Sequence, residues 1–513
     1  MDTKRATPVI AYLPAFAFTL AYLLYQYLLS GISNTVSPGK TLRALVVLFA
    51  LLVVLAFIAY KALKDHTKAG LALWLAAELF LFSQKFFIIS GIAAAVVVLL
   101  WMGLTLLRKK KIAIQYVSFL LTVLGFGLAI GMAFVRVPWA LIFKHIPQKA
   151  EASELSLVAP EAPPDIYFVV LDAYARTDIL NDFFGFDNAA FTGYLLEKGF
   201  VIPEDNHSNY ASTELSITST LNMQYIQSLL PDAEGWPYWW LLSPLIEDSA
   251  VKSALAEAGY QSVAVAVDWE VTNNKAVDIY LNPQPVRLNE FEKLLIQTSP
   301  LKLFSPVLSK FTYLNTNAAH RELIDFAFAS LAEIPEIEGP TFTLTHITAP
   351  HPPFVFDAEG LPITPSYAYS FYDGNLFPGT QEQYITGYVG QLQSINQQLE
   401  RAIDAILNKS ETPPIIIIMG DHGSRLGADF IDPANTCVRE GFSNFAAFYL
   451  PGLDADAVPA DITSVNVFRL ILDQYFGAEL GLLENHAYFA GNGQFYHYDD
   501  VTSLLHQECE VSP

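Results

Sequence analysis

Side chains that bind metal ions follow short apolar runs in the C-terminal two thirds of the chain. Asp172 follows one such run, and Asp421 and His422 follow another. Between these two positions in the sequence, Thr213 begins a predicted helix in the sequence NYASTELS. Two carboxylates, one imidazole and one hydroxyl group form a suitable ligand set for a hard divalent cation such as Mn²⁺, Zn²⁺ or Mg²⁺. These four residues are therefore the first candidates for a site.

The elements that must position these residues alternate between strands and helices. Strand-like runs rich in β-branched residues are followed or separated by helical patterns, which predicts a mostly parallel sheet covered on both faces. Ligands of such sheets bind at the carboxyl ends of the strands, where the four candidates lie. The predicted strands are 165–171, 262–267, 341–347 and 414–419, and the predicted helices include 188–198, 253–258 and 381–408.

Each candidate also has a simpler interpretation. Asp172 alone is more often a turn or capping residue, and Thr213 alone is more often a helix N-cap. His351, in the Pro-rich text HITAPHPPF, is compatible with a packed loop histidine. The Gly-Asp-His-Gly turn at 420–423 is more specific, because its glycines permit close backbone approach to a bound group. All of the simpler interpretations would have to coincide, so we favour a functional site.

Composition excludes several functional classes. The 513 residues are 52% hydrophobic and 16% charged, with a formal net charge of −22. This balance excludes a general nucleic-acid binder, which needs a basic surface. Two cysteines, Cys437 and Cys509, are too few for a disulfide scaffold or a multi-cysteine zinc site. Their separation in the sequence leaves open whether they pair.

Charge and hydropathy divide the chain in two. Residues 1–150 carry a net charge of +12 and the remainder carries −34. The first part also contains the long apolar runs, and about 20 apolar residues cross a bilayer. Glu78 and Lys85 interrupt the third run, for which a buried amphipathic segment is the alternative. We predict a transmembrane bundle of five spans: Pro8–Ser30, Thr41–Leu63, Leu71–Ser90, Gly91–Leu107 and Ile112–Val135.

The placement of basic residues predicts the orientation. With five spans and a cytoplasmic N-terminus, the clusters at 61–68 and 108–111 face the cytoplasm, and the short outer loops carry little beyond Lys40. The first run lacks a small-residue cleavage site and is expected to stay as an anchor. We expect an integral inner-membrane protein with an anchor (1–143), an extracytoplasmic linker (144–164) and a periplasmic α/β catalytic domain (165–513).

Four stretches together resemble a known family. The texts VLDAY, NYASTELS, HITAPHPPF and MGDHG are similar to the alkaline phosphatase superfamily, and most closely to its membrane-anchored, sulfatase-like branch. That branch includes lipoteichoic acid synthase and the lipid A phosphoethanolamine transferases, and the similarity covers roughly Pro164 to Phe476. The resemblance implies a C-terminal sulfatase-like (alkaline phosphatase-like) fold.

The resemblance also implies roles for individual residues. It implies that Asp172, Thr213, Asp421 and His422 bind one divalent metal ion, and that Thr213 is the nucleophile. A threonine hydroxyl group is a poor nucleophile until a metal lowers its pKa, which agrees with this assignment. His351 would then protonate the leaving oxygen or donate a hydrogen bond to the phosphate. His346, near the same strand end, is a weaker candidate.

The sequence departs from parts of the family. Residues 209–222 contain neither Pro nor Arg, so the motif whose Cys or Ser becomes formylglycine in sulfatases is absent. An Asp-x-x-x-His spacing, which marks two-metal members, is absent between 173 and 420, so a single metal is favoured. The twelve residues after Gly423 contain no His, which weakens the similarity to the phosphoethanolamine transferases in particular. Arg176 is compatible with either a phosphate contact or an ion pair with an acid on its own helix.

The resulting hypothesis is a membrane-bound enzyme that performs metal-dependent phosphoryl transfer. It would take a head-group phosphate ester or diester from a membrane phospholipid and pass it, through Thr213, to a cell-envelope glycan or lipid acceptor. Hydrolysis of phosphate or sulfate esters at the same site is one alternative. A non-catalytic envelope scaffold is another. A transporter is disfavoured, because the predicted spans contain few charged residues and Glu78 alone does not indicate a substrate path through the membrane.

Overall fold

The computed structural model divides the chain into two compact units. One combines Met1–His145 with Val286–Leu314, and the other combines Ile146–Pro285 with Asn315–Pro513. The predicted spans at 91–107 and 112–135, the end of the third span and the first part of the linker fall largely or wholly outside the described residues. The structure describes residues 7–29, 32–34, 36–81, 120–125, 127, 131, 155, 157–283, 288–304, 307, 316–367, 369–491 and 493–509.

The helical unit begins with three helices, α1 (Thr7–Leu29), α2 (Leu42–Leu63) and α3 (His66–Leu81). Two segments, Val9–Leu28 and Pro38–Leu63, are long and apolar enough to cross a membrane, and they coincide with the first two predicted spans. Large apolar side chains of α2 are exposed along its whole length, as on a helix that faces lipid. The five-span count stays a prediction.

A six-stranded sheet forms the centre of the second unit, in the order β3-β2-β4-β1-β5-β6. Neighbouring strands are parallel except for β6, which runs antiparallel to β5. All four predicted strands are present, with ends shifted by at most two residues. The strands are β1 (Ile166–Leu171), β2 (Gln261–Val265), β3 (Ile279–Leu281), β4 (Thr341–Ile347), β5 (Ile415–Gly420) and β6 (Ala446–Tyr449), with a separate pair of β7 (Tyr488–Phe489) and β8 (Asp499–Asp500).

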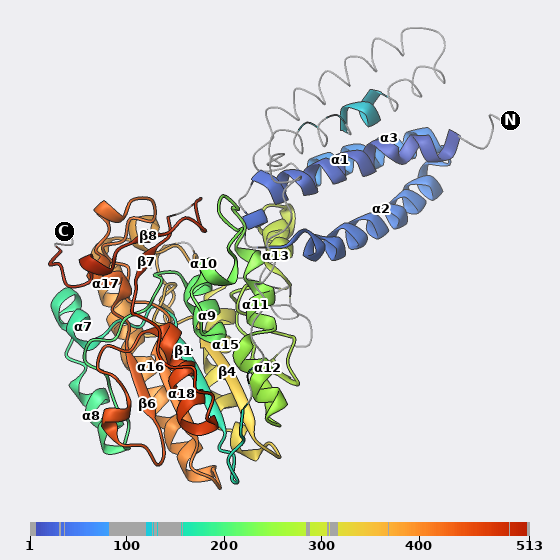
Figure 1. Cartoon of the computed structure of the whole chain (residues 1–513). Helices are drawn as coiled ribbons and strands as arrows, with labels where there is room; N and C mark the ends of the chain where they lie inside the picture. Colours follow the sequence, from blue (N-terminus) through green and yellow to red (C-terminus); the bar gives the residue numbers. More distant parts are fainter. Residues whose placement is uncertain are drawn as a thin grey trace. The chain divides into compact units, whose positions relative to one another are not determined.

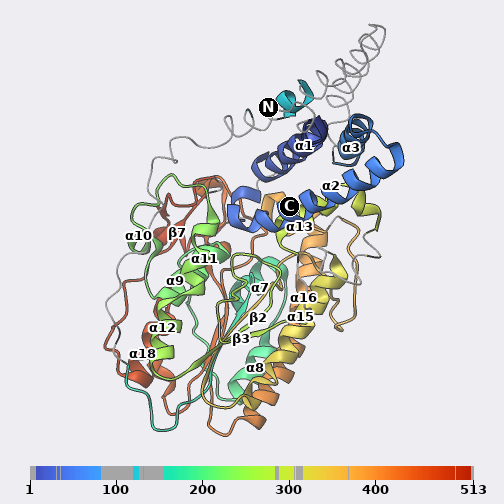
Figure 2. The same ribbon diagram turned by 90° about the vertical axis from the view of Figure 1, so that its right-hand side faces the viewer.

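Helices cover both faces of this sheet (Figures 1 and 2). The main apolar core lies between one face and α7, α8, α15 and α16. On the other face, Phe468 of α18 packs edge-on against Phe168 and Phe342, and α9 and α12 lie on the same side. The helices of the unit are α7 (Thr177–Phe184), α8 (Ala189–Glu197), α9 (Thr213–Asn222), α10 (Ile226–Leu229), α11 (Ser243–Glu247), α12 (Ala250–Glu257), α15 (Asn317–Leu331), α16 (Gln381–Lys409), α17 (Val438–Phe442) and α18 (Val467–Phe476).

Local sequence explains where the long helix begins. The Thr380 side chain accepts a hydrogen bond from the Gln383 N–H, and the Gln383 side chain accepts one from the Thr380 N–H. This reciprocal cap satisfies two amide groups that the first turn of α16 would otherwise leave unpaired. The helix then presents an apolar stripe to the sheet, as its polar and apolar periodicity predicts.

Candidate metal centre

The strand register brings the predicted ligands to one edge of the sheet. Leu171, the last residue of β1, pairs with Ile347 of β4 on one side and with Gly420 of β5 on the other. Asp172 and Asp421 therefore leave adjacent strands at the same level. Both residues are buried, with 4% and 1% of their surface exposed. Burial of two carboxylates at this spacing is costly unless a cation or several donors compensate them.

Each of the two carboxylates has one oxygen without a hydrogen-bond partner in the described part of the chain. Asp421 Oδ1 accepts bonds from the backbone N–H of Ala173 (2.9 Å) and of His422 (3.0 Å), and this fixes the orientation of the group. Asp421 Oδ2 and Asp172 Oδ1 are the buried oxygens without a partner. Such atoms are what a metal ion would coordinate.

The ring of His422 is oriented for the same point. Its Nδ1 lies 2.7 Å from the carbonyl oxygen of Gly423. Because a carbonyl oxygen only accepts, Nδ1 carries the proton and Nε2 presents its lone pair. Nε2 lies 3.6 Å from Asp172 Oδ1 and 3.5 Å from Asp421 Oδ2. Burial lowers the pKa of His422, which favours this neutral, ligating form.

Thr213 is the first residue of α9, whose ten residues are all buried. The N-cap position belongs to Ser212, so Thr213 is not the capping residue. The Thr213 Oγ1 lies 3.4 Å from His422 Nε2. One turn further, the Ser216 hydroxyl group donates to the Asp421 carbonyl oxygen at 2.6 Å and ties α9 to the end of β5. The nucleophile candidate is thus held rigidly beside three potential ligands.

His346 belongs to this cluster more closely than its sequence context indicated. Its Nε2 lies 3.5 Å from Asp172 Oδ2 and has no hydrogen-bond partner among the described residues. Its Nδ1 lies 2.8 Å from the Thr272 hydroxyl group, which fixes the ring. One ligand atom from each of Asp172, His346 and Asp421 lies within 4.8 Å of the others, so these buried side chains fit a divalent cation.

The histidines determine the charge state of Asp172. Burial by itself would raise the pKa of this carboxyl group. His351 and His346 more than offset that effect, so the pKa of Asp172 is lowered and the group is ionised. The pKa of His346 moves the opposite way: burial would lower it, but Asp172 raises it. An ionised carboxylate is the form that a metal site requires.

His351 lies across the site on the loop after β4. Its backbone N–H donates to the Asp172 carbonyl oxygen at 3.1 Å, which ties the loop to the metal centre. Its Nδ1 donates to the Pro352 carbonyl oxygen at 2.6 Å, and its Nε2 lies 3.4 Å from Asp373 Oδ2. Asp373 lies in a loop far from any apolar run, and the sequence contained no signal for it. It lies beside the imidazole ring of His351 and helps to orient it.

Asp268 was missed, although the rule used for the other residues also applies to it. It follows the predicted strand at 262–267, which β2 largely confirms. Its Oδ2 lies 2.8 Å from His320 Nδ1, and its Oδ1 accepts from the Thr348 hydroxyl group at 2.9 Å. Asp268 therefore supports the loop after β4, and both of its oxygens are engaged.

The two glycines of the Gly-Asp-His-Gly turn are needed for packing against the protein itself. A Cβ atom on Gly420 would lie 2.4 Å from the carbonyl oxygen of Tyr174, and one on Gly423 would lie 1.9 Å from that of Glu440. Both distances are far below van der Waals contact. The close approach predicted for these glycines is therefore made to neighbouring backbone.

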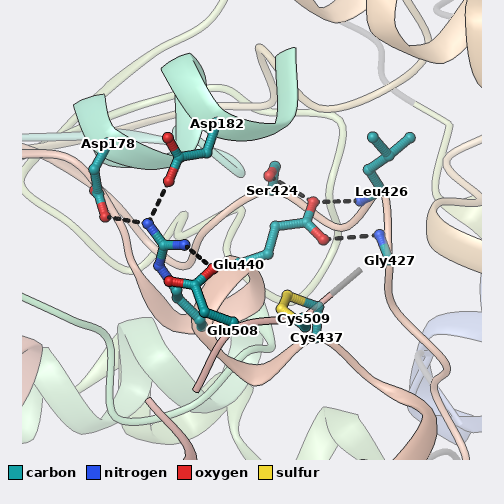
Figure 3. The surroundings of a disulfide bond; sticks show 10 residues. Asp178, Asp182, Ser424, Leu426, Gly427, Cys437, Glu440, Glu508 and Cys509 are labelled. Carbon is teal, nitrogen blue, oxygen red and sulfur yellow. Dashed lines mark hydrogen bonds and ion pairs between the residues drawn. A yellow bond between two sulfur atoms is a disulfide. The ribbon is translucent and has the colours of Figure 1, made fainter. Parts of the chain in front are cut away.

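Glu440 of α17 holds the loop that follows His422 (Figure 3). Its carboxylate accepts from the Ser424 hydroxyl group (2.7 Å) and from the N–H groups of Leu426 (2.6 Å) and Gly427 (2.7 Å). Burial raises the pKa of Glu440 to about 7 in spite of these donors. Arg425, which follows Ser424 in this loop, is also held in place, because its Nη2 donates to the Ala211 carbonyl oxygen.

The C-terminal segment is attached to the same helix. Cys437, at the N-cap of α17, is disulfide-bonded to Cys509, which answers the question that the sequence left open. Beside it, Arg439 forms ion pairs with Asp178 (3.2 Å) and Asp182 (2.6 Å) of α7. Arg176 also pairs with Asp178, at 2.7 Å, so its ion-pair interpretation is the correct one.

An aromatic rim lies next to Thr213. The indole N–H of Trp269 donates to Glu214 Oε1 at 3.0 Å, and burial raises the pKa of Glu214 to about 7. The ring of Phe371 packs at 5.7 Å from Trp269 and at 6.2 Å from His351, measured between ring centroids. The β2–β3 and β4–α16 connections thus meet beside Glu214, the neighbour of Thr213.

A family model, and not any single relative, identifies the family of the chain. A family model described as Sulfatase matches residues 188–474. No curated protein matches the chain. The C-terminal periplasmic domain of EcEptC from Escherichia coli is similar in structure, with 9% identity, a TM-score of 0.46, and coverage of 69% of this chain and 98% of that one.

Two further solved structures are similar over a large part of the chain. The integral membrane protein lipooligosaccharide phosphoethanolamine transferase A (EptA) from Neisseria meningitidis has 13% identity and a TM-score of 0.39, and the match covers 86% of this chain and 76% of that one. The lipoteichoic acid synthase LtaP from Listeria monocytogenes has 12% identity and a TM-score of 0.38, with coverage of 63% and 76%. The Sulfatase model spans more than half of the residues, and the chain therefore belongs to the sulfatase family of enzymes, within the alkaline phosphatase superfamily.

Proposed function

We propose that the protein is a membrane-bound, metal-dependent phosphoryl transferase in which Thr213 is the nucleophile. The observation that carries this proposal is the convergence of unpartnered, buried ligand atoms from Asp172, His346 and Asp421 beside Thr213 and His422. For comparison, both carboxylate oxygens of the buried Asp268 are bonded to protein groups.

The metal would be held by Asp172, Asp421, His422 and Thr213, with His346 as an additional ligand. When bound, a divalent ion at this position lowers the pKa of the threonine hydroxyl group and offsets charge on the phosphoryl oxygens. The Nδ1–H of His422 donates to the Gly423 carbonyl oxygen, and this bond keeps Nε2 available as a ligand. The chain offers both oxygen and nitrogen donors, so Mn²⁺, Zn²⁺ and Mg²⁺ are all candidates.

The protein groups account for both halves of a transfer. In the first half, Thr213 Oγ1, as the alkoxide that a bound metal would favour, forms a bond to phosphorus, the bond from phosphorus to the leaving alcohol breaks, and His351 protonates the departing oxygen. In the second half, an acceptor hydroxyl group attacks the phosphothreonine, its proton passes to His351, and the bond from phosphorus to Thr213 breaks and releases Thr213 as the alkoxide. Asp373 Oδ2, 3.4 Å from His351 Nε2, orients the ring for both steps.

The phosphoryl oxygens need donors as well. Thr213 begins a helix, so its neighbouring backbone N–H groups and the helix dipole favour an anion at this point. The Nε of Arg425 is buried and has no hydrogen-bond partner in the described segments. The electrostatic interaction of Arg425 with both His422 and Glu214 supports a role for this residue in binding the phosphate.

We propose a phospholipid head group as donor and a cell-envelope glycan or lipid as acceptor. The apolar helices α1 and α2 support this choice, because an anchored enzyme keeps its site near lipid. The part of the chain after residue 150 carries −34 charges and would not adhere to an anionic membrane by itself. Anchoring by spans is then the means of reaching the donor. We place the N-terminus in the cytoplasm and the catalytic domain in the periplasm.

The test is intact-protein mass spectrometry of the full-length protein purified from its own membranes. We expect a mass increment on the wild type that is absent from Thr213→Ala, and the size of the increment names the transferred group. Thr218→Ala is the matched control, since Thr218 is buried on the same helix and lies outside the site. An increment that persists in Thr213→Ala would contradict the nucleophile assignment.

Acceptor choice is tested with the same material. Incubation of the labelled protein with water alone, or with an envelope glycan, separates a hydrolase from a transferase by the fate of the increment. Loss of the increment in water at the same rate as with the glycan would favour the hydrolase. Acceleration by the glycan, with recovery of the modified glycan, would favour the transferase.

A further inference from the structure

One segment of the C-terminal part of the sequence does not belong to the catalytic fold. Residues 286–314 lie between β3 and α15 in the sequence, but they group with the helical unit. Their described part contains α13 (Glu290–Gln297) and a short 3₁₀ helix, η4 (Pro300–Phe304). We call residues 288–304 the docking segment. The helical unit therefore includes a piece of chain that the catalytic sequence contributes.

The docking segment is attached to the α1–α2 end of the helical unit by specific polar contacts. Glu292 pairs with both Arg43 Nε (2.5 Å) and Arg43 Nη2, and its side chain is only 9% exposed. The Asn289 side chain donates to the Lys40 carbonyl oxygen at 2.9 Å. The Tyr22 hydroxyl group lies 3.1 Å from the Thr298 hydroxyl group. A two-pronged Arg–Glu pair supported by two further hydrogen bonds fixes both position and register.

Packing and capping reinforce this attachment. Phe291 is buried in one apolar cluster with Tyr22 and Leu23 of α1 and with Ala44 of α2. Glu292 also accepts from the Asn289 N–H, and Asn289 accepts from the Glu292 N–H, so the residue that binds Arg43 is also part of the cap of α13. The helix start and the ion pair therefore depend on each other.

The other end of the docking segment presents apolar side chains to the surroundings. Leu303 is 82% exposed and Phe304 is 58% exposed, and the neighbouring Lys302 is exposed too. These residues lie next in sequence to a helix that is fastened to the end of two membrane-length helices. Exposed Leu and Phe beside a Lys are typical of segments at the boundary between lipid head groups and acyl chains.

We propose that the docking segment is a membrane-interface element whose occupant is the lipid surface. In it, α13 binds the periplasmic ends of α1 and α2, and η4 inserts Leu303 and Phe304 into the head-group region of the bilayer. The catalytic chain is then tied to the membrane twice, at its start and again after β3. The inference depends on α1 and α2 spanning the membrane and does not depend on the chemistry proposed for Thr213.

This proposal also gives Arg43 a role. Arg43 lies at the start of α2 on the side that the positive-inside rule assigns to the periplasm. Its charge is matched by Glu292, so it does not oppose the predicted orientation. The basic residues Lys61 and Lys64 lie at the other end of α2, as expected for the cytoplasmic side.

The test uses nitroxide labels on the full-length protein in phospholipid vesicles. The two native cysteines are disulfide-bonded, so an introduced cysteine is the labelling site. Leu303→Cys is compared with Ile431→Cys, which is 74% exposed in the catalytic unit, and with Leu51→Cys on the exposed face of α2. We expect the label at 303 to be about threefold less accessible than that at 431 to a water-soluble nickel complex, and more accessible to oxygen.

Two results would overturn the proposal. One is a label at 303 as accessible to the nickel complex as the label at 431. The other is a label at 303 that is shielded from both reagents, which would indicate burial in protein. The charge reversals Arg43→Glu and Glu292→Arg should each move the 303 label toward water, and their combination should restore the wild-type accessibility. No step of this test requires catalysis, so its outcome is independent of the phosphoryl transfer.

Discussion

Two pairs of buried carboxylates in the catalytic unit differ in how their oxygens are engaged. Asp172 and Asp421 each keep one buried oxygen without a hydrogen-bond partner among the residues that the structure describes. Asp268 and Glu440, buried to a similar degree nearby, have both oxygens bonded to protein donors. This difference distinguishes the carboxylates that can bind a metal ion from the carboxylates that hold the loops around the metal site.

The comparison also explains why the site is rigid. Glu440 fixes the loop after His422. Asp268 accepts a hydrogen bond from Thr348, in the loop that leads to His351, and also contacts His320 of α15. The satisfied carboxylates thus act as positioning residues. If this division is correct, substitutions in the two groups will have different consequences, and the following predictions test it from the largest expected effect to the smallest.

The largest effect is expected for Asp421→Asn. The amide oxygen can still accept from the N–H groups of Ala173 and His422, so the fold should survive while the free oxygen is lost as an anionic ligand. We expect transfer activity to fall by about a thousandfold or more, because the activated nucleophile depends on the metal. Asp268→Asn is the matched control and should lower the thermal midpoint while the protein keeps its metal. Equal metal loss in both variants would refute the division.

A second effect concerns pH and Glu440. The folded-state pKa of Glu440 is raised from its ordinary value of 4.5 to about 7, so ionisation of this group destabilises the folded state. The protonated Glu440 therefore stabilises the folded state fully below pH 4.5, and this contribution is lost as the pH rises through about 7. The total contribution to the free energy of unfolding is about 3 kcal/mol. Glu440→Gln should flatten this part of the stability profile in denaturant titrations between pH 4.5 and 8. An unchanged slope would contradict the assignment.

The smallest effect distinguishes two buried histidines. His346→Gln should weaken metal binding by about tenfold to a hundredfold, because it removes a ligand and its link to Thr272. His320→Gln should leave metal affinity unchanged, since His320 binds Asp268 and packs against Tyr369 and Phe371. Calorimetric titration of the metal-free protein with Zn²⁺ or Mn²⁺ measures both. Equal affinities for the two variants would remove His346 from the ligand set.

The sequence was sufficient for those parts of the fold that repeat a simple pattern. The apolar runs that became β1, β4 and β5 are fully buried strands, and their ends carry the predicted Asp172, Asp421 and His422. Strand β3 is only three residues long and partly buried, so it is too short to be recognised from the sequence. Its place at the edge of the sheet follows from pairing with β2, which is a tertiary contact.

The residues that were missed depend on contacts between distant segments. Asp373 approaches His351 from a loop without strand or helix signals, and Arg425 takes its position from Ala211 and Phe430. The docking segment looks like an ordinary amphipathic insertion in the sequence, because Glu292 and Arg43 are separated by 249 residues. His346 was the weaker candidate because the amino-acid sequence does not show which of the two histidines lies closer to Asp172.

The most direct measurement of the central claim is the metal content of the full-length protein by native mass spectrometry. The account predicts one divalent ion per chain in the wild type, loss of that ion in Asp421→Asn, and its retention in Asp268→Asn. An ion retained in Asp421→Asn, a second ion in the wild type, or a wild type that binds no divalent ion when supplied with Mn²⁺, Zn²⁺ or Mg²⁺ would contradict it.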